Sequence, residues 1–177
     1  HTEWGEIGKA TMSYGYGITV TPIQLAQAYS VIANNGLYTP LSLRKGLFNE
    51  SKRVINEDTA KTLLSMLEKV VEDGTSKKAT VNGYRVGGKS GTAWKTSGAG
   101  GYSTDRYRSI FAGIAPIDDP RLVAVVFIEE PTGEFYYGGD VAAPVFSEII
   151  SQSLQLLSIP PQGFITKPDL VADNKSD

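Results

Sequence analysis

Within residues 84–95, YRVGGKSGTAWK, the segment GGKSGT over 87–92 combines an ammonium group, two hydroxyls and three glycines in a stretch that otherwise has strand character. Alternation along a strand places Ser90 and Thr92 on one face and Lys89 on the other. Glycine inside a strand marks a bulge or the close approach of a ligand, and Gly91 leaves the space beside Lys89 open. On an edge strand, an extended peptide could add to the backbone while these polar groups bind its carboxylate. An ordinary turn with a solvated lysine is the competing interpretation, because such short triplets also occur by chance.

Helix signals flank this stretch. Thr21 is a predicted N-cap, followed by Pro22 at the first helical position and Gln24 three residues after the cap, and Asn35-Gly36 ends the helix. A second helix is expected from Asn56 to Gly74, with acidic residues in its first turn. Its apolar positions at helical spacing are Leu63, Leu67, Val70 and Val71.

A hairpin and a last helix follow. Strands near 84–94, 108–116 and 121–129 are expected to form one antiparallel sheet. Both faces of the last two strands are apolar, so we expect other elements to pack on both faces of the sheet. A helix from about 142 to 157 is expected to pack on this sheet. The residues taken as its apolar face are Phe146, Ile149, Ile150 and Leu157. The predicted fold class is therefore α/β, an antiparallel sheet flanked by helices.

Composition narrows the possible functions. The chain has 177 residues, 41% hydrophobic and 20% charged, which suits one compact domain or a large piece of one. With 17 basic and 19 acidic residues, no positive excess favours a nucleic-acid partner. There is no cysteine and the single histidine is His1, so a His/Cys metal site is not expected, and no cofactor is predicted. Because the first residues show neither an initiator Met nor a signal peptide, we expect an excised piece whose targeting and anchoring segments lie upstream.

Several ordered blocks resemble one known family. GKSGTA is similar to the K-[ST]-G motif of penicillin-binding proteins and β-lactamases. The blocks GYGITVTPIQLAQAYSVIANNG, EDGTSKKATVNGYRVGGKSGTA, YRSIFAGIAP and YYGGDVAAPVFSEI resemble successive blocks of the class B penicillin-binding proteins, most closely their septal peptidoglycan transpeptidases. The resemblance runs from about Trp4 to Pro161 and implies part of a transpeptidase domain over 1–161, with a polar tail over 162–177.

The resemblance implies a serine D,D-transpeptidase of septal cell-wall synthesis. A serine attacks the D-Ala-D-Ala end of a peptidoglycan stem peptide, releases D-alanine and passes the acyl group to an amine of a second stem. β-Lactams are attacked in the same way and stay attached. The implied location is the periplasmic face of the bacterial inner membrane, with division-machinery proteins as partners. A β-lactam-sensing domain or a non-catalytic scaffold of the same fold remains the alternative.

The family's nucleophile is not evident in this chain. It lies in an S-x-x-K motif at a helix start, and an S-x-N motif follows it, but no S-x-N occurs here. The one S-x-x-K match, from Ser42 to Lys45, sits in an extended-looking segment after the first helix, so Ser42 is interpreted as a surface strand residue. We therefore expect the nucleophile and S-x-N on an upstream half of the domain.

Residue roles follow from the resemblance. Lys89 would shape the proton network around the S-x-N serine and attract a carboxylate. The hydroxyls of Ser90 and Thr92 would donate hydrogen bonds to the carboxylate of the substrate or β-lactam, and the Thr92 N–H would contribute to the oxyanion hole. Gly91 would leave room for the ligand along the strand.

Aromatic residues extend the expected site. Tyr107, Tyr136 and Tyr137 match positions that line the pocket in the family, with ordinary sheet packing as the alternative. Trp94 stands where relatives carry a basic residue, so a charged contact there does not carry over.

Overall fold

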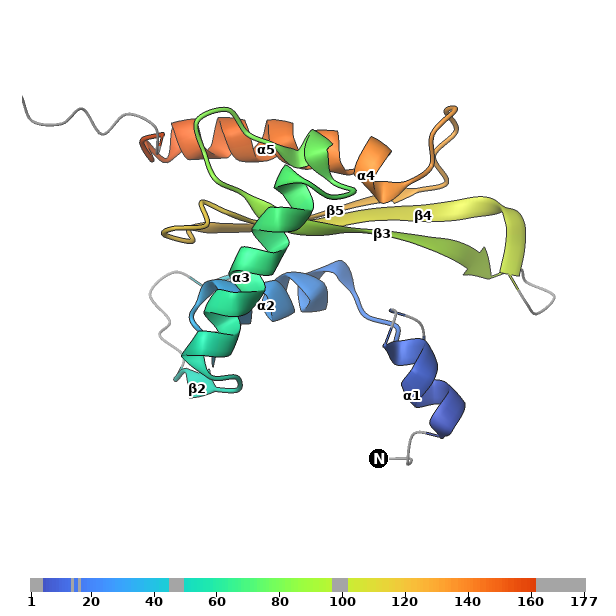
Figure 1. Ribbon diagram of the computed structural model, residues 1–177, viewed down its shortest axis with the longest axis horizontal. Coiled ribbons are helices and arrows are strands. Elements are labelled where there is room, and N and C mark those ends of the chain that lie inside the picture. Colours follow the sequence, from blue (N-terminus) through green and yellow to red (C-terminus); the bar gives the residue numbers. More distant parts are fainter. Residues whose placement is uncertain (1–4, 14, 16, 45–49, 97–101, 162–177) are drawn as a thin grey trace, which may run out of the picture.

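A three-stranded antiparallel sheet forms the centre of the protein in a computed structural model, which describes residues 5–13, 15, 17–44, 50–96 and 102–161 (Figure 1). The sheet order is β3-β4-β5, with β3 spanning Gly87–Thr96, β4 Tyr102–Ala115 and β5 Leu122–Glu129. The predicted strands and their antiparallel pairing are confirmed. β3 begins three residues later than expected, because Val81 and Tyr84 pair with each other in a separate bridge.

Helices cover both faces of this sheet, as the apolar strands predict. α2 (Pro22–Ala33) and α3 (Glu57–Glu72) lie on one side, and α4 (Gly138–Val141) and α5 (Ala143–Leu156) on the other (Figure 1). Phe111 of β4 packs on Phe146 of α5, with ring centroids 4.8 Å apart. Ile114, also on β4, belongs to a second cluster with Leu64 of α3. The α/β class with a flanked antiparallel sheet is therefore confirmed.

Smaller elements complete the described fold. α1 spans Glu6–Met12 and the 3-10 turn η1 spans Lys77–Ala79, while β1 (Leu37–Tyr38) and β2 (Lys52–Arg53) form a separate two-stranded ribbon. None of the described helices is long and apolar enough to cross a membrane. The polar tail predicted over 162–177 lies outside the described residues, and the division of the chain at 161 stays a prediction.

The local capping signals are confirmed. The Thr21 hydroxyl accepts the Gln24 backbone N–H at 3.3 Å, and the Gln24 side chain accepts the Thr21 N–H at 2.9 Å, so α2 begins with a full capping box. Asn56 caps α3 by accepting the Thr59 N–H at 2.7 Å.

The expected helix faces are partly wrong. On α5 the buried stripe is Ala143, Phe146, Ile150 and Leu154. Ile149 is 46% exposed because it lies at the rim of that stripe, and Leu157 is 54% exposed because the helix ends one residue before it. On α3 the buried residues are Ala60, Leu64, Glu68 and Val71. Of the expected positions only Val71 is fully buried, while Leu63, Leu67 and Val70 are half-buried.

Candidate active site

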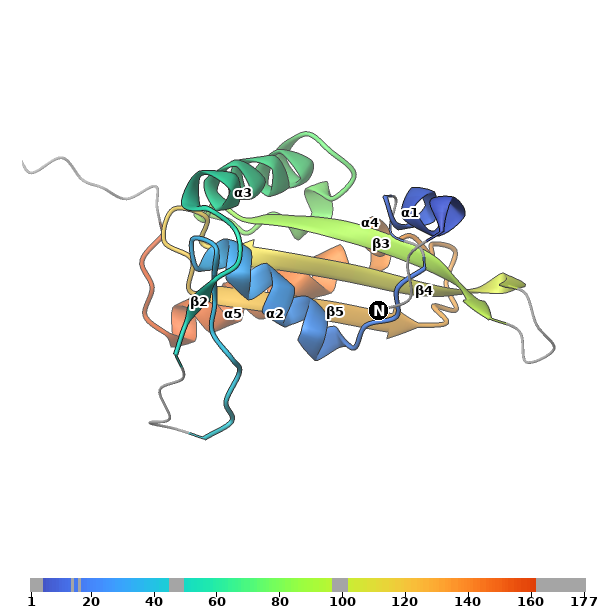
Figure 2. The same ribbon diagram turned by 90° about the horizontal axis from the view of Figure 1, so that it is seen from below.

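The K-S-G-T strand lies at the margin of the sheet. β3 pairs with β4 and has no second strand neighbour in the described part of the chain. Figure 2 shows β3 at one side of the three strands, with α1 and α3 beside it. The sequence-based expectation of an edge strand is therefore confirmed, and this edge is the place where an extended peptide could align.

The predicted alternation along β3 is also confirmed. Thr92 stands opposite Ser109, and Ser90 stands opposite Phe111, whose ring faces α5. Opposed residues share a face, so both hydroxyls project toward the side of α4 and α5. Lys89 pairs with Ala112 on the opposite face, where its exposed ammonium donates to the Ser90 carbonyl at 2.7 Å.

A hollow borders β3 on each face. One, of about 420 Å³, lies toward α2, with Leu25 and Tyr29 opposite the strand. The other, of about 500 Å³, lies toward α4 and is lined by Thr75 and the segment 137–140. Lys89 borders both hollows. A ligand lying along this strand would therefore be within reach of the ammonium and of the hydroxyls on the other face.

The glycines of β3 serve different purposes. A Cβ on Gly87 would come within 2.9 Å of the Glu68 backbone nitrogen, and one on Gly88 within 2.5 Å of the Phe111 ring, so both allow close packing. A Cβ on Gly91 would meet nothing nearer than 3.9 Å. The space beside Gly91 is therefore open, as the bare-strand interpretation requires.

The Thr92 hydroxyl is oriented by the loop before α4. Its oxygen accepts the Gly138 backbone N–H at 3.0 Å, which leaves its own proton available for an acceptor in the adjoining hollow. A hydrogen bond from the Ser109 hydroxyl to the Tyr136 carbonyl anchors the same loop. Gly138 sits so close to the strands that a Cβ would lie 2.5 Å from the Gly91 carbonyl oxygen. Gly138 is not among the site residues predicted from the sequence, although it lies in the YYGG block that carries the resemblance.

Thr75 is a second residue beside β3 that the sequence does not predict for the site. It follows α3, and its hydroxyl lies 3.4 Å from that of Ser90. Its carbonyl oxygen would lie 2.3 Å from a Cβ on Gly139, so the loop after α3 meets the loop before α4 beside β3. No local spacing signal in the sequence points to this contact, because it joins positions 15 residues apart through the turn at η1.

The three predicted tyrosines form one aromatic row. Tyr107 stacks on Tyr136 with ring centroids 4.0 Å apart, and Tyr136 meets Tyr137 at 4.4 Å. Trp94 extends the row, 4.9 Å from Tyr107. Tyr137 lines the hollow with Ser90, and the other rings stack behind it. The hydrogen bond between the hydroxyls of Tyr136 and Tyr137 raises the pKa of Tyr137, so the Tyr137 hydroxyl stays protonated at neutral pH.

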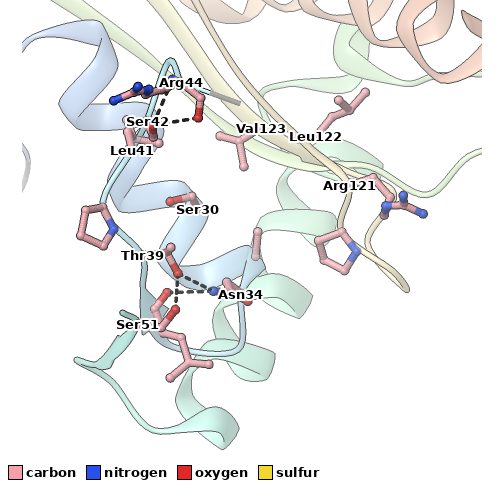
Figure 3. Close-up of a pocket in the computed structure, with 14 residues that line it drawn as sticks. Ser30, Asn34, Thr39, Leu41, Ser42, Arg44, Ser51, Arg121, Leu122 and Val123 are labelled. Carbon is pink, nitrogen blue, oxygen red and sulfur yellow. Dashed lines mark hydrogen bonds between the residues drawn. The ribbon is translucent and has the colours of Figure 1, made fainter. Parts of the chain in front are cut away.

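Ser42 lies in a different place. It lines a hollow of about 650 Å³ between α2, the segment 37–44 and the β4–β5 turn, which shares no residue with either hollow beside β3 (Figure 3). Its hydroxyl accepts the Arg44 N–H at 3.0 Å and donates to the Arg44 carbonyl at 3.2 Å. Ser42 is exposed, as expected, but it lies in an irregular segment and not in a strand, because its hydroxyl stabilises a local turn. Lys45 lies outside the described residues.

The described residues contain no cluster of three or more His, Cys, Asp or Glu side chains that could hold a metal ion. The groups beside β3 are hydroxyl donors, one ammonium group, backbone amides, aromatic rings and the carboxylate of Asp140, which pairs with Lys78 at 2.7 Å.

Comparisons with known proteins agree with this geometry. Residues 1–151 match the penicillin binding protein transpeptidase domain. The chain is 46% identical over 177 residues to a probable peptidoglycan D,D-transpeptidase, PbpC, of Pseudomonas aeruginosa. This match covers 99% of this chain and 31% of that protein. It is 41% identical over 165 residues to the peptidoglycan D,D-transpeptidase FtsI of Escherichia coli, covering 92% of this chain and 28% of the relative.

A solved structure shows the same arrangement. The transpeptidase domain of penicillin-binding protein 3 from Burkholderia pseudomallei superposes with a TM-score of 0.81 at 45% identity, over 90% of this chain and 49% of that one. The chain thus spans less than a third of the two curated relatives and about half of the solved domain. Sequence, fold and strand geometry together place this chain in the penicillin-binding protein transpeptidase family.

Proposed function

We propose that this chain supplies one half of the active site of a serine D,D-transpeptidase that cross-links peptidoglycan stem peptides during septal cell-wall synthesis. The observation that carries the proposal is the K-S-G-T strand at the sheet edge, with its ammonium and hydroxyls on opposite faces and a hollow on each side. Family membership and the relatives named peptidoglycan D,D-transpeptidases support it.

The strand's groups fit the proposed substrate. A stem peptide ending in D-Ala-D-Ala would lie along β3, with its terminal carboxylate accepting hydrogen bonds from Ser90 and Thr92 beside the Lys89 ammonium. Thr92 suits this role because its oxygen already accepts the Gly138 N–H, which directs its proton elsewhere. Gly91 leaves space for the peptide, and Tyr137 forms the wall of the hollow beside it, supported by its ring contact with Tyr136 and by the stack of Tyr136 on Tyr107.

The proposed reaction is acyl transfer through a serine ester. The nucleophile's oxygen bonds to the carbonyl carbon of the penultimate D-alanine, the peptide C–N bond breaks, and the departing amine of D-alanine takes a proton. The Thr92 N–H would stabilise the oxyanion, a donor of the kind whose loss costs about 2.7–4 kcal/mol of barrier. An amine of a second stem then accepts the acyl group. A β-lactam would acylate the same serine and remain attached.

The nucleophile and the S-x-N serine belong, in this proposal, to an upstream half of the domain. The length of the relatives supports this, since the solved domain is about twice as long as its match with this chain. Apolar side chains that a second half could cover are exposed along α1 and the start of α2, namely Ile7, Ile18, Val20 and Ile23. Residues 1–161 would then belong to the transpeptidase domain and 162–177 to a tail.

The proposed setting is the periplasmic face of the bacterial inner membrane, with anchoring through an upstream segment and contacts with division-machinery proteins. This proposal rests on the resemblance of the blocks around Thr21 and Gly138 to septal transpeptidases, and on the relatives' names.

Labelling with a fluorescent penicillin tests the proposal. The chain produced with its upstream half should become covalently labelled, whereas the chain alone should not. Stem-peptide cross-linking by the same complex before penicillin is added separates a transpeptidase from a β-lactam sensor, which would acylate without forming cross-links. A scaffold would give neither signal. Labelling of the isolated chain that disappears in Ser42→Ala would show that Ser42 is the nucleophile and would overturn the divided site.

A further inference from the structure

An ion pair joins a buried carboxylate of α3 to Arg85, whose side chain is 55% exposed and which lies two residues before the K-S-G-T strand. The Glu68 side chain, on the sheet-facing stripe of α3, is 8% exposed. Arg85 donates to both of its carboxylate oxygens, from Nε at 2.6 Å and from Nη2 at 2.7 Å. The remaining arm of the guanidinium donates to Asp118, in the β4–β5 turn, at 2.5 Å. The hydrogen bond to Glu68 raises the pKa of Arg85, so its guanidinium group stays charged.

Stability alone is a weak reason for this arrangement. Burying a carboxylate costs several kcal/mol, and well-packed apolar side chains in place of an ion pair are often equally or more stabilising. The surrounding positions on α3 are apolar, with Leu64 and Val71 buried on the same stripe. The ion pair contributes a defined geometry, because a bidentate guanidinium–carboxylate contact fixes both the distance and the orientation of the two elements that it joins.

The elements joined here are those that place the candidate site. The Arg85 carbonyl accepts the Ile117 N–H at 2.9 Å, so its backbone is held by the β4–β5 turn as well. Two residues later, Gly87 lets the α3 backbone approach until a Cβ would lie 2.9 Å from the Glu68 nitrogen. The start of β3 is therefore fixed against α3 by this bidentate contact and by close backbone packing.

α3 reaches the same strand a second time. After its last residue, Glu72, the chain turns at Gly74 and brings the Thr75 hydroxyl within 3.4 Å of Ser90. α3 and the turn that follows it thus contact this part of the chain twice, because Glu68 binds Arg85 just before β3 and Thr75 lies beside Ser90 on β3. A shift of α3 along the strand would change the position of Thr75 relative to the hydroxyls of the site.

We propose that Glu68 and Arg85 are positioning residues of the active site. Their ion pair fixes α3 against β3, and so holds Lys89, Ser90 and Thr92 in the geometry that acylation needs, without touching the ligand. This inference rests on the proposed function. Its expected size follows from geometry, because a misplacement of reacting groups by about 1 Å can cost about 100-fold in rate.

The test uses the chain in complex with its upstream half. Glu68→Gln keeps the shape but removes the charge, and Arg85→Lys keeps the charge but removes the bidentate contact. Each should slow β-lactam acylation by about tenfold or more at a temperature where circular dichroism shows a fully folded protein. Amide hydrogen exchange over residues 87–93 should become faster in both. The matched control is Glu57→Gln, which breaks an exposed pair with Lys61 on the same helix and should change neither readout.

Two readouts separate the possible failures. Variants that lower only the melting temperature, with parental acylation rates and parental exchange over 87–93, would show a purely stabilising pair and overturn the inference. If Glu68→Gln does not fold, Arg85→Lys decides the question alone. If the unsubstituted complex is not acylated at all, the proposed function fails, while the exchange comparison still decides whether the pair positions β3.

Discussion

Two glycines on β3, three positions apart, should respond in opposite ways to the same substitution. A Cβ on Gly91 would meet only Ile110 Cβ, at 3.9 Å, which is ordinary contact. Gly91→Ala should therefore not destabilise the fold, and the reduced freedom of the unfolded chain should stabilise it by about 0.4–1 kcal/mol. The new methyl would project into the hollow that Lys89 borders toward α2. Acylation should slow by about tenfold to 100-fold, because the ligand must move away from the strand.

Gly88→Ala provides the matched comparison. Its Cβ would lie 2.5 Å from Phe111 Cζ and 2.6 Å from the Ala112 carbonyl oxygen. Overpacking of this kind costs about 1–3 kcal/mol, which exceeds the gain from restricting the unfolded chain. The backbone oxygen cannot yield as a side chain would, so the strain must be relieved by a shift of β3 against β4. Gly88→Ala should therefore lower the melting temperature.

The assay measures second-order acylation rates and melting temperatures for both variants in the complex with the upstream half. Gly91→Ala should melt at or above the parental temperature and acylate slowly. Parental acylation by Gly91→Ala would refute the reasoning, because it would mean that no ligand passes over this part of the strand. Destabilisation by Gly91→Ala together with a neutral Gly88→Ala would refute the structural account of the glycines.

Substitutions at three further positions test separate parts of the protein. Thr92→Val should cost about 1–3 kcal/mol of stability, because it leaves the Gly138 N–H without its acceptor, and should slow acylation about tenfold to 100-fold; Thr92→Ser, which keeps the hydroxyl, should retain most of both in thermal melts and acylation assays. Tyr107→Ala should lower the melting temperature by removing a stacked pair worth about 0.5–1.5 kcal/mol. If its acylation rate equals the parental rate, the Tyr107 ring serves only to pack on the sheet and does not contribute to the pocket. The Lys95 ammonium lowers the pKa of Glu129 below its ordinary 4.5, so its contribution to stability should be present at neutral pH and lost as the pH falls through the folded-state pKa. Urea unfolding of Glu129→Gln should therefore differ from the parent at pH 7 and converge with it in acid; a constant difference would contradict this assignment.

Local signals in the sequence predicted the secondary structure well. Thr21, Gln24 and Asn56 act within one helical turn of the groups they cap, so residue type and spacing were sufficient. The two faces of β3 followed from strand alternation alone, because the side-chain period of a strand is fixed by its backbone. The edge position of this strand was inferred from its glycines, and the sheet order confirmed it.

The buried faces of the helices depended on information that is not local. Ile149 and Ile150 are equally apolar, yet only Ile150 is buried, because the direction from which α5 meets the sheet selects one narrow stripe. Glu68 shows the same limit from the other side. A glutamate at a core position interrupts the apolar pattern of α3, and only its ion pair with Arg85 explains why it is buried there. Its burial could not be predicted from α3 alone.

The hydrogen bond between Thr92 and Gly138 joins a predicted site residue to one that no local pattern connects with it. The residues are 46 positions apart, and the bond between them sets the direction of a hydroxyl that the resemblance assigns to carboxylate binding. Tyr137 precedes Gly138, so the loop that orients this hydroxyl also presents the aromatic ring at the rim of the same hollow. The Ser109 hydroxyl holds the Tyr136 carbonyl, which fixes this loop to β4 on its other side. Any displacement of the aromatic row must therefore change the Gly138 N–H, and with it the hydrogen-bond geometry of Thr92. For this reason, substitutions at Tyr136 or Tyr137 should alter carboxylate binding as well as contacts with the rest of a ligand.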